Sequence, residues 1–525
     1  MDTKALRQKI LDLAIRGKLV PQDPNDEPAS VLLERIRAEK QQMVKDGKLK
    51  AKDIKNDTVI FLGDDNLHYE KFPDGTVKCI EDEIPFELPE GWEWTRLQAI
   101  CEPITDGTHK TPTYSDEGFI FLSSKNVTSG HIDWDNIMYI PESLHNELYA
   151  RLAPKKNDIL LAKNGTTGVA AIVDRDCIFD IYVSLALLRI IGYIIYPEYL
   201  LSTIASSTIQ NYFNSSLKGI GVPNLHLEHI RTTLIPVAPI NEQYQIATKL
   251  EQLLSFADNI ESDKDDLQTT IQLTKSKILD LAIRGKLVPQ NPDDEPASVL
   301  LDRIRAEKEE LIKQGKIKHD KKESVIFKGD DNSYYEKIGD TVTCIDEELP
   351  FELPDEWTWC RGASCFLPME SRKPSSSHFK YIDIDSIDNK HQAIREAKIT
   401  ETAKAPSRAS RAVFDGSILF SLVRPYLKNI ALVDSSNADS IASTGFYIAT
   451  SNGVFIPKFL YILMISAYVV DGLNQFMKGD NSPSINKDNI EKWLYPVPPL
   501  TEQVKIADTV QKYLSILEDI EKSLS

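Results

Sequence analysis

Apolar residues recur at alternating intervals of four and three residues through the middle of the chain. They fall at positions 246, 250, 253, 257, 260, 267, 271, 278 and 281, interrupted at Lys264 and Thr274. This spacing is typical of the seam of a coiled coil and predicts one long central helix. The C-terminus repeats the first half of the seam and the N-terminus the second half, at these positions: Ile506, Val510, Tyr513, Leu517, Ile520 and Leu524; Leu6, Ile10 and Leu13.

The chain is a tandem duplication of one unit. Residues 9–40 match residues 277–308 at 29 of 32 positions, and the closing segments 236–247 and 496–507 share the pattern P-V-x-P-[IL]-x-EQ-x2-IA. The two chain ends together make up one copy of the central helix, so the duplication is circular. We therefore expect the termini to lie close together and the central helix to pair with its two-part twin, antiparallel, in a pseudo-two-fold molecule.

Each copy carries the same arm after the helix. Gly17 and Gly285, with Pro21 and Pro289 shortly after them, predict the end of a helix. Short helices are predicted at 29–45 and 297–313, followed in the first copy by a hairpin with strands 69–72 and 76–80 around a Pro-Asp-Gly turn. Because the arm occurs twice, we interpret it as a connector or a surface for docking a partner.

The two long inserts between the repeated frames differ almost everywhere in sequence. Strands are predicted at 158–162 and 170–173 in the first and at 417–421 and 429–433 in the second, with helical patches near 198–213 and 458–477. Their similar order suggests one fold with different loops, in the α+β class. The resulting division is 1–20 (half of the second composite helix), 21–94 (arm 1), 95–235 (insert 1), 236–288 (central helix), 289–359 (arm 2), 360–495 (insert 2) and 496–525 (the other half-helix).

The formal net charge of −18 argues at first against a nucleic-acid partner, because phosphate binding needs clustered Lys and Arg. The distribution of charge changes this interpretation. Residues 95–235 hold 11 basic and 14 acidic residues, residues 361–497 hold 16 and 13, and the frame holds 34 basic against 52 acidic. Inserts that face DNA and a frame that faces proteins would fit these counts, and so would a frame that is acidic for solubility.

No apolar run is long enough to cross a membrane and no signal peptide is evident, so we expect a cytoplasmic protein without a membrane partner. The six cysteines include no CxxC pair and are interpreted as isolated buried thiols. Neither an NPP[FY] tetrapeptide, a GxxxxGK[ST] loop nor a metal-binding histidine spacing is present. We therefore expect no catalytic residue, no cofactor and no metal in this chain.

The order of variable block, EQ-x2-IA segment, long helix and second variable block resembles the specificity subunit of a type I restriction-modification system. The phrases ELPEGWEWTRL (87–97), ITDGTHKTP (104–112), SILFSLVRPYLKNIALV (417–433) and PVPPLTEQVKIA (496–507) are similar to stretches of that family. The resemblance implies two target recognition domains that each read half of a split, asymmetric site in double-stranded DNA, separated by two long antiparallel helices. The arms depart from many members of the family.

The resemblance also implies docking of two adenine methyltransferase subunits, which bind S-adenosylmethionine, and of two restriction subunits, which use ATP and Mg²⁺. A different hypothesis is a repeat-built adaptor that binds proteins and no DNA. The negative net charge favours it mildly, and the resemblance along the whole chain opposes it. An enzyme fused into one insert is a third reading, which the missing motifs oppose.

Residues that could contact DNA are polar or cationic side chains in loops, since Arg and Lys read guanine, Asn and Gln read adenine, and small polar groups hold phosphates. The candidates in the first insert are Thr108, His109, Lys110, Thr111, Lys125, Asn126, Lys163, Asn164, Thr166, Lys218 and Asn224. Those in the second are Arg372, Lys373, Ser375, Ser376, His378, Arg408, Arg411, Arg424, Tyr426, Lys428, Lys478, Asn481 and Asn486.

Overall fold

The computed structural model describes residues 2–128, 130–192, 194–217, 223–316 and 324–524. The chain divides into two compact units, Met1–Asp263 and Lys264–Ser525. Each unit holds one arm, one insert and part of the helical frame. The frame helices are α1 (Thr3–Ile15), α8 (Ile240–Ile283) and α14 (Leu500–Leu524).

In unit 1, α1 packs against the first part of α8. Arg7 donates to Glu261 at 2.6 Å and also pairs with Asp258, while Gln22 Nε2 donates to Glu242 at 3.2 Å. Residue numbers rise along one segment as they fall along the other, so the two run antiparallel. α1 ends as predicted, because Gly17 adopts a left-handed φ of 63°.

In unit 2, α14 packs in the same sense against the second part of α8. Lys275 pairs with Glu521 at 2.7 Å, and Gln290 Nε2 donates to Glu502 at 2.7 Å. Three predicted seam residues are exposed instead: Tyr513 at 45%, Leu267 at 41% and Ile520 at 39%. Leu514 packs against the core in place of Tyr513, because a straight α-helix drifts away from a strict seven-residue repeat.

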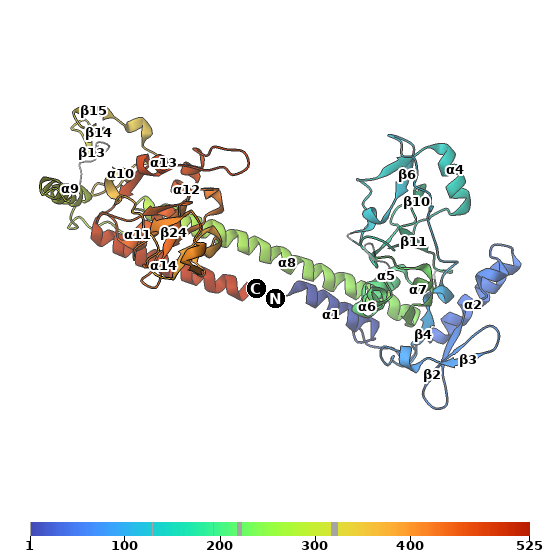
Figure 1. The fold of residues 1–525 in the computed structure, drawn as a ribbon. Coiled ribbons are helices and arrows are strands. Elements are labelled where there is room, and N and C mark those ends of the chain that lie inside the picture. Colours follow the sequence, from blue (N-terminus) through green and yellow to red (C-terminus); the bar gives the residue numbers. More distant parts are fainter. Residues whose placement is uncertain (1, 129, 193, 218–222, 317–323, 525) are drawn as a thin grey trace. The chain divides into compact units, whose positions relative to one another are not determined.

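The arms consist of one helix and a three-stranded antiparallel sheet. Both helices have the predicted bounds and the hairpin is confirmed, but the first strand of each sheet was not predicted. Figure 1 shows β2 and β3 of unit 1 beside α2 and apart from β6 and β10 of the insert. The arm elements are α2 (Ala29–Lys45), β1 (Val59–Leu62), β2 (His68–Lys71) and β3 (Val77–Cys79) in unit 1, and α9 (Ala297–Lys313), β13 (Ser324–Lys328), β14 (Tyr334–Ile338) and β15 (Thr341–Cys344) in unit 2.

Each insert leaves and rejoins the frame at one two-stranded antiparallel ribbon. In unit 1 this ribbon is β4 (Glu93–Arg96) with β12 (Leu234–Val237), and in unit 2 it is β16 (Thr358–Arg361) with β26 (Leu494–Val497). Buried Trp94 and Trp359 lie at corresponding positions of these ribbons. Each insert therefore begins and ends at the same place on the frame.

The inserts share a strand framework. β8 lies between β9 and β11 in the first insert, as β22 lies between β23 and β25 in the second, and the parallel pair β6 and β10 matches β17 and β24. The elements of insert 1 are α3 (Leu97–Ile100), β5 (Thr105–Asp106), β6 (Phe119–Leu122), β7 (Met138–Ile140), α4 (Glu142–Arg151), β8 (Ile159–Ala162), β9 (Ala170–Ile172), β10 (Phe179–Ile181), β11 (Leu185–Leu188), α5 (Pro197–Ala205), α6 (Ser207–Ser215) and α7 (Leu227–Thr232). Those of insert 2 are α10 (Gly362–Cys365), β17 (His378–Ile382), β18 (Ile387–Asp388), β19 (Ala393–Ile394), β20 (Lys398–Glu401), β21 (Ala409–Ala412), β22 (Ile418–Ser421), β23 (Ile430–Leu432), β24 (Ile441–Ser443), β25 (Phe446–Ala449), α11 (Pro457–Ile465), α12 (Ala467–Asn474) and α13 (Lys487–Lys492).

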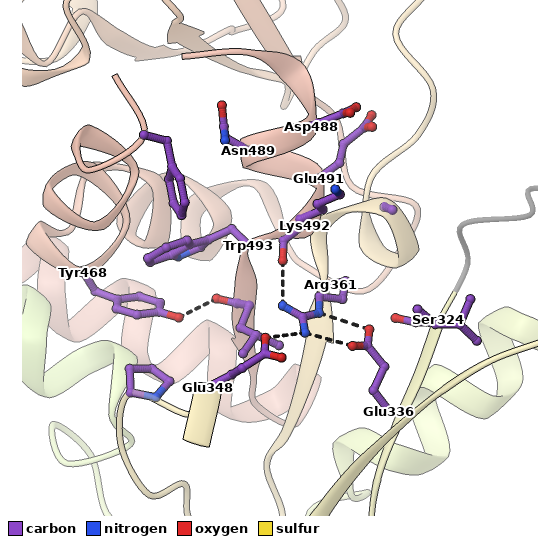
Figure 2. A pocket seen from close by; sticks show the side chains of 15 residues that line it. Ser324, Glu336, Glu348, Arg361, Tyr468, Asp488, Asn489, Glu491, Lys492 and Trp493 are labelled. Carbon is purple, nitrogen blue, oxygen red and sulfur yellow. Dashed lines mark hydrogen bonds and ion pairs between the residues drawn. The ribbon is translucent and has the colours of Figure 1, made fainter. Parts of the chain in front are cut away.

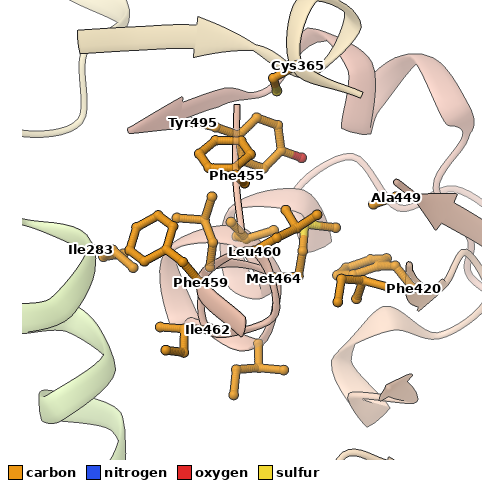
Figure 3. Packing of buried hydrophobic residues seen from close by; sticks show 14 of the residues in the cluster. Ile283, Cys365, Phe420, Ala449, Phe455, Phe459, Leu460, Ile462, Met464 and Tyr495 are labelled. Carbon is orange, nitrogen blue, oxygen red and sulfur yellow. The ribbon is translucent and has the colours of Figure 1, made fainter. Parts of the chain in front are cut away.

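A continuous core joins each insert to its frame. In unit 2 the buried face of α11, including Phe459 and Leu460, lies beside Ile283 of α8 (Figure 3). Ile506 of α14 belongs to the same cluster. The corresponding cluster of unit 1 joins Tyr199 of α5 with Ile246 of α8. Burial of apolar surface therefore fixes the base of each insert on the frame.

The cysteines correct one expectation. All six are free, but Cys79 and Cys344 are exposed and Cys177 is half-buried, so the six are not uniformly buried thiols. The two exposed ones lie on the outer strands of the arm sheets, which pair with a neighbour on one side. Among the described helices, none combines the length and apolar character needed to cross a membrane.

Candidate nucleic-acid interface

Three candidate loops of the first insert meet around residues 182–184. The amide of Val183 donates to the carbonyl of Thr108 at 3.0 Å, and the amide of Lys163 donates to the carbonyl of Ser184 at 2.8 Å. The Ser184 hydroxyl accepts a third hydrogen bond from the amide of Ser124 at 3.0 Å. The loops at 107–111, 123–126 and 163–167 therefore form one surface. Ser184, which ties two of them together, had no signal in the sequence.

Two candidates on this surface are engaged inside the protein. Lys163 is 6% exposed and pairs with buried Asp106, and Asn126 is 5% exposed, with its amide group donating to the carbonyls of Asp133 and Asn136. Both side chains are thus held by contacts within the insert. Asp106 lies 57 residues from Lys163, and Asp133 and Asn136 lie 7 and 10 residues from Asn126, in contacts that a loop pattern does not reveal.

Polar groups without partners line the neighbouring loop. The backbone at Asn164 forms an isolated antiparallel β-bridge with the backbone at Asn224. The side-chain oxygens of Asn164, Thr166 and Asn224 are shielded from solvent and accept no hydrogen bond from the described residues. Asparagine is the residue type that pairs with adenine in the major groove. Lys218 lies outside the described residues. Thr108 is half-buried, whereas the remaining candidates of this insert are exposed: His109, Lys110, Thr111 and Lys125.

In the second insert, the turn between β22 and β23 contains two cations in left-handed backbone. Arg424 has a φ of 47° and Lys428 a φ of 55°, a region that side chains other than glycine rarely adopt. The corresponding turn between β8 and β9 has glycine at both places, Gly165 with a φ of 79° and Gly168 with a φ of 87°. Insert 2 thus holds exposed Arg and Lys where insert 1 uses the residue that avoids strain.

This turn borders an open groove of about 620 Å³. Arg424 donates through its backbone to Pro483 and through Nη2 to the carbonyl of Asn481, both at 2.8 Å, which brings the loop at 478–484 beside the turn. Exposed Arg395 also lines the groove, and sequence reasoning missed it because it is a single cation between predicted elements. Tyr426, 46% exposed, lies on the same turn.

The other candidates of the second insert differ in exposure. Arg372 is held over the Phe414 ring at 5.4 Å and donates to the carbonyl of Ala438, and half-buried Arg411 has its Nε shielded without a partner among the described residues. Asn486 caps α13 by accepting from the amide of Asn489. The remaining candidates are exposed: Lys373, Ser375, Ser376, His378, Arg408, Lys478 and Asn481.

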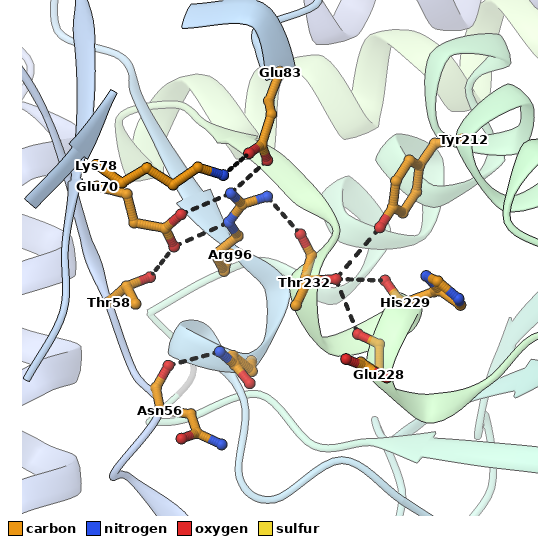
Figure 4. A network of polar contacts seen from close by, with 11 residues as sticks. Asn56, Thr58, Glu70, Lys78, Glu83, Arg96, Tyr212, Glu228, His229 and Thr232 are labelled. Carbon is orange, nitrogen blue, oxygen red and sulfur yellow. Dashed lines mark hydrogen bonds and ion pairs between the residues drawn. The ribbon is translucent and has the colours of Figure 1, made fainter. Parts of the chain in front are cut away.

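An arginine clamp fastens each arm to the base of its insert. Arg96, at the end of β4, pairs with Glu70 of the arm at 2.8 Å and Glu83 at 2.7 Å, and donates to the carbonyl of Thr232 at the end of α7 (Figure 4). Arg361 makes the same three contacts in unit 2, with Glu336, Glu348 and the carbonyl of Lys492 (Figure 2). There the clamp lines a cavity of about 790 Å³ between the arm and α13.

The clamp sets the protonation of its buried carboxylate. Burial alone would raise the pKa of Glu70, but hydrogen bonds from Arg96 and Thr58 outweigh it and hold the pKa below its ordinary value. Glu336 behaves in the same way with Arg361. Both arms are therefore held by ionised, buried pairs. The described residues contain no group of three His, Cys, Asp or Glu side chains arranged to hold a metal ion.

Two segments of the chain match one family of known proteins. Residues 89–268 and 380–525 match the family described as "Type I restriction modification DNA specificity domain". The chain is 28% identical to the type I restriction enzyme EcoAI specificity subunit of Escherichia coli, over 97% of this chain and 89% of that one. It is 27% identical to the EcoEI specificity subunit of Escherichia coli, over 99% of this chain and 90% of that one.

A solved structure has a similar fold. A chain from a structure described as explaining complex assembly and conformational transition of the type I R-M system matches with a TM-score of 0.53. It is 18% identical and the match covers 84% of this chain and 94% of that chain.

Proposed function

Because this chain belongs to the type I restriction modification DNA specificity family and is a specificity subunit, we propose that its two inserts each read one half of a split, asymmetric DNA site. The observation that carries the proposal is the pair of inserts itself. They share a strand framework and a left-handed turn at the same place, but they present different side chains there. Two sets of loops on one scaffold suit two different base sequences.

The proposed contact surface is formed by the loops around Ser184 in insert 1 and by the groove beside Arg424 in insert 2. Cations such as Arg424 and Arg395 would bind phosphates or guanine, and exposed amides such as Asn481 would read adenine. Lys163 and Asn126 hold the surface in shape and do not take part in reading.

We further propose that α8 pairs with α1 and α14 as one antiparallel coiled coil with pseudo-two-fold, circular symmetry, which brings the termini together. Such a pair of helices would hold the two inserts at a fixed separation and inverted orientation. The half-site centres would then be about one turn of the DNA helix apart. The contacts of Arg7 with α8 in unit 1 and of Lys275 with α14 in unit 2 support this pairing.

Catalysis is proposed to belong to the partners. Two adenine methyltransferase subunits would bind S-adenosylmethionine and flip the target base, and two restriction subunits would use ATP and Mg²⁺. This chain would select the DNA sequence and hold the partner subunits in position on it. The acidic frame, with 34 basic and 52 acidic residues, suits protein contacts better than DNA contacts.

Genome-wide mapping of methylated adenines in cells that carry the system tests the proposal. We expect one asymmetric motif of two specified parts separated by an unspecified spacer of constant length. A single contiguous motif, or methylation without sequence preference, would contradict it.

A further inference from the structure

The outward face of the arm sheet carries apolar and aromatic side chains in register. In unit 1, Phe61 lies opposite Tyr69, which lies opposite Cys79, and Val59 and Val77 flank Lys71 in the next row. Alternation along a strand places these six residues on one face and buried Ile60 and Glu70 on the other. Phe61 is 38% exposed, Val77 is 51% exposed, and the rings of Phe61 and Tyr69 stack at 5.9 Å.

The second arm presents the same face, residue for residue. Its rows are Phe327, Tyr335 and Cys344, and Val325, Lys337 and Val342. The rings of Phe327 and Tyr335 also stack at 5.9 Å, and Val342 is 51% exposed. In each arm these six residues form one surface, the arm face.

Three strand positions off the arm face have changed between the copies, while the buried pair Ile60 and Glu70 is kept as Ile326 and Glu336. Leu62 is replaced by Lys328, His68 by Tyr334 and Lys78 by Thr343. A solvated surface has no need for exposed aromatic rings, whereas aromatic and apolar clusters on a surface are typical of protein interfaces. Two copies of one face on one chain indicate two copies of one partner.

The rim of the arm face is acidic. Asp64, Asp65 and Asp74 are exposed around it in unit 1, as are Asp330, Asp331 and Asp340 in unit 2. The Tyr69 and Tyr335 hydroxyls donate to Asp65 and Asp331, each at 2.8 Å. Apart from one lysine in each, Lys71 and Lys337, the arm faces are apolar or aromatic, and the acidic rim complements a protein patch with Lys and Arg at its edge.

The arginine clamp fixes the arm face relative to the insert of the same unit. Arg96 ties Glu70 of the arm sheet to the carbonyl of Thr232 at the base of the insert, and Arg361 does the same in unit 2. A protein bound to the arm face is therefore held at a constant position relative to the insert of the same unit. That is the requirement for an enzyme that must act on an adenine near the bases which the insert reads.

The arm sheets, residues 59–79 and 324–344, lie outside the two segments that match the DNA specificity domain, 89–268 and 380–525. We propose that each arm face binds one copy of the adenine methyltransferase subunit of the same system, through an apolar patch edged by basic residues. This inference rests on the proposed function and assigns the docking surface that it leaves open.

Cys79 and Cys344 allow the unmodified protein to be tested, because both lie exposed on the arm face. We expect purified methyltransferase subunit to slow maleimide labelling of both thiols by about tenfold or more, as for residues buried in an interface. Half-buried Cys177, in insert 1, is the internal control and should label at its original rate. A DNA duplex alone or the restriction subunit alone should protect neither arm thiol. Unchanged labelling with methyltransferase, or protection by one of the other two, overturns the proposal.

Variants add a measure of stoichiometry by native mass spectrometry. Phe327→Asp with Val342→Asp should reduce bound methyltransferase from two copies to one, and the same change at Phe61 and Val77 should act alike. Leu62→Lys is the matched control, because it alters an exposed residue on the same strand to the one found at Lys328. Two copies bound at unaltered affinity after changes in both arms would overturn the inference. If the adenine map is bipartite despite that result, the proposed function stands and the arm inference alone has failed.

Discussion

At the scale of single residues, the structure separates side chains that hold loops from side chains that are free to contact DNA. Lys163 and Arg424 are both cations in polar loops of the inserts, but Lys163 is buried against Asp106 and Arg424 is exposed beside a groove. The left-handed backbone at Arg424 and Lys428 is the feature that most favours a role for these two side chains in DNA binding. Strain at a residue other than glycine is retained where the side chain is needed.

Arg424→Gly and Lys428→Gly test this assignment. Glycine occupies the corresponding places in insert 1, so we expect the free energy of unfolding to stay within about 1 kcal/mol of the parent protein. DNA binding should weaken by about fivefold or more for each change, since a cation that contacts a base or phosphate is lost. Fluorescence anisotropy of the assembled complex on a cognate duplex measures the affinity, and thermal denaturation measures the stability.

Asn332→Gly is the control for that pair, because Asn332 has a φ of 65° in an exposed turn of the arm. It should leave DNA affinity unchanged. Loss of stability without loss of affinity at Arg424 would show that its contact with the Asn481 carbonyl is structural, and would remove the turn from the interface.

At the scale of elements, the sequence predicted the helices of the arms to the residue but missed parts of the rest. The helices at 29–45 and 297–313 have an apolar stripe and clear ends, whereas β1 is a run of four apolar residues without polar–apolar alternation. The predicted helical patches are each two helices, because Ser206 and Ser466 cap a new helix within a continuous apolar pattern. The loops of the candidate interface could be predicted from their polar residues, but their burial depends on partners distant in sequence, such as Asp106 for Lys163.

The arginine clamp is the element-scale contact whose loss should be largest. Arg96→Ala leaves Glu70 buried and unpaired, so we expect the free energy of unfolding of unit 1 to fall by about 3 kcal/mol. The double change Arg96→Met with Glu70→Gln should recover much of this loss, because no buried charge remains. Lys78→Met, which breaks an exposed pair with Glu83, should cost under about 1 kcal/mol. Chemical denaturation measures all three, and equal losses for Arg96→Ala and Lys78→Met would contradict the role of the clamp.

The clamp also predicts a dependence of stability on pH. The pKa of Glu70 is lowered in the folded protein, so below about pH 4.3, the ordinary pKa of a glutamate, the unfolded chain binds more protons. Stability from this pair is complete above that pH and is lost as the pH falls through the folded pKa. Glu70→Gln should remove this part of the acid sensitivity, and an identical pH profile for parent and variant would contradict the prediction.

At the scale of the whole molecule, the chain combines one repeated frame with two inserts of different sequence. The frame copies agree at 29 of 32 positions between residues 9–40 and 277–308, and each insert is closed at its base by one ribbon. Such an arrangement predicts modular behaviour, because the core under each insert belongs to its own unit. The order of repeats and inserts, and a single fold for the two inserts, could be predicted from the sequence, whereas the parallel pairs β6 with β10 and β17 with β24 could not, because they join strands far apart in the chain.

The most direct test of independent reading by the two inserts is to exchange one of them at its ribbon. Residues 97–233, between β4 and β12, are replaced by the corresponding insert of another specificity subunit, and methylated adenines are mapped in cells that carry the chimera. We expect one half of the recognised site to change while the other half and the spacer stay as they were. Change in both halves, or an unchanged site from a folded and active chimera, would contradict it.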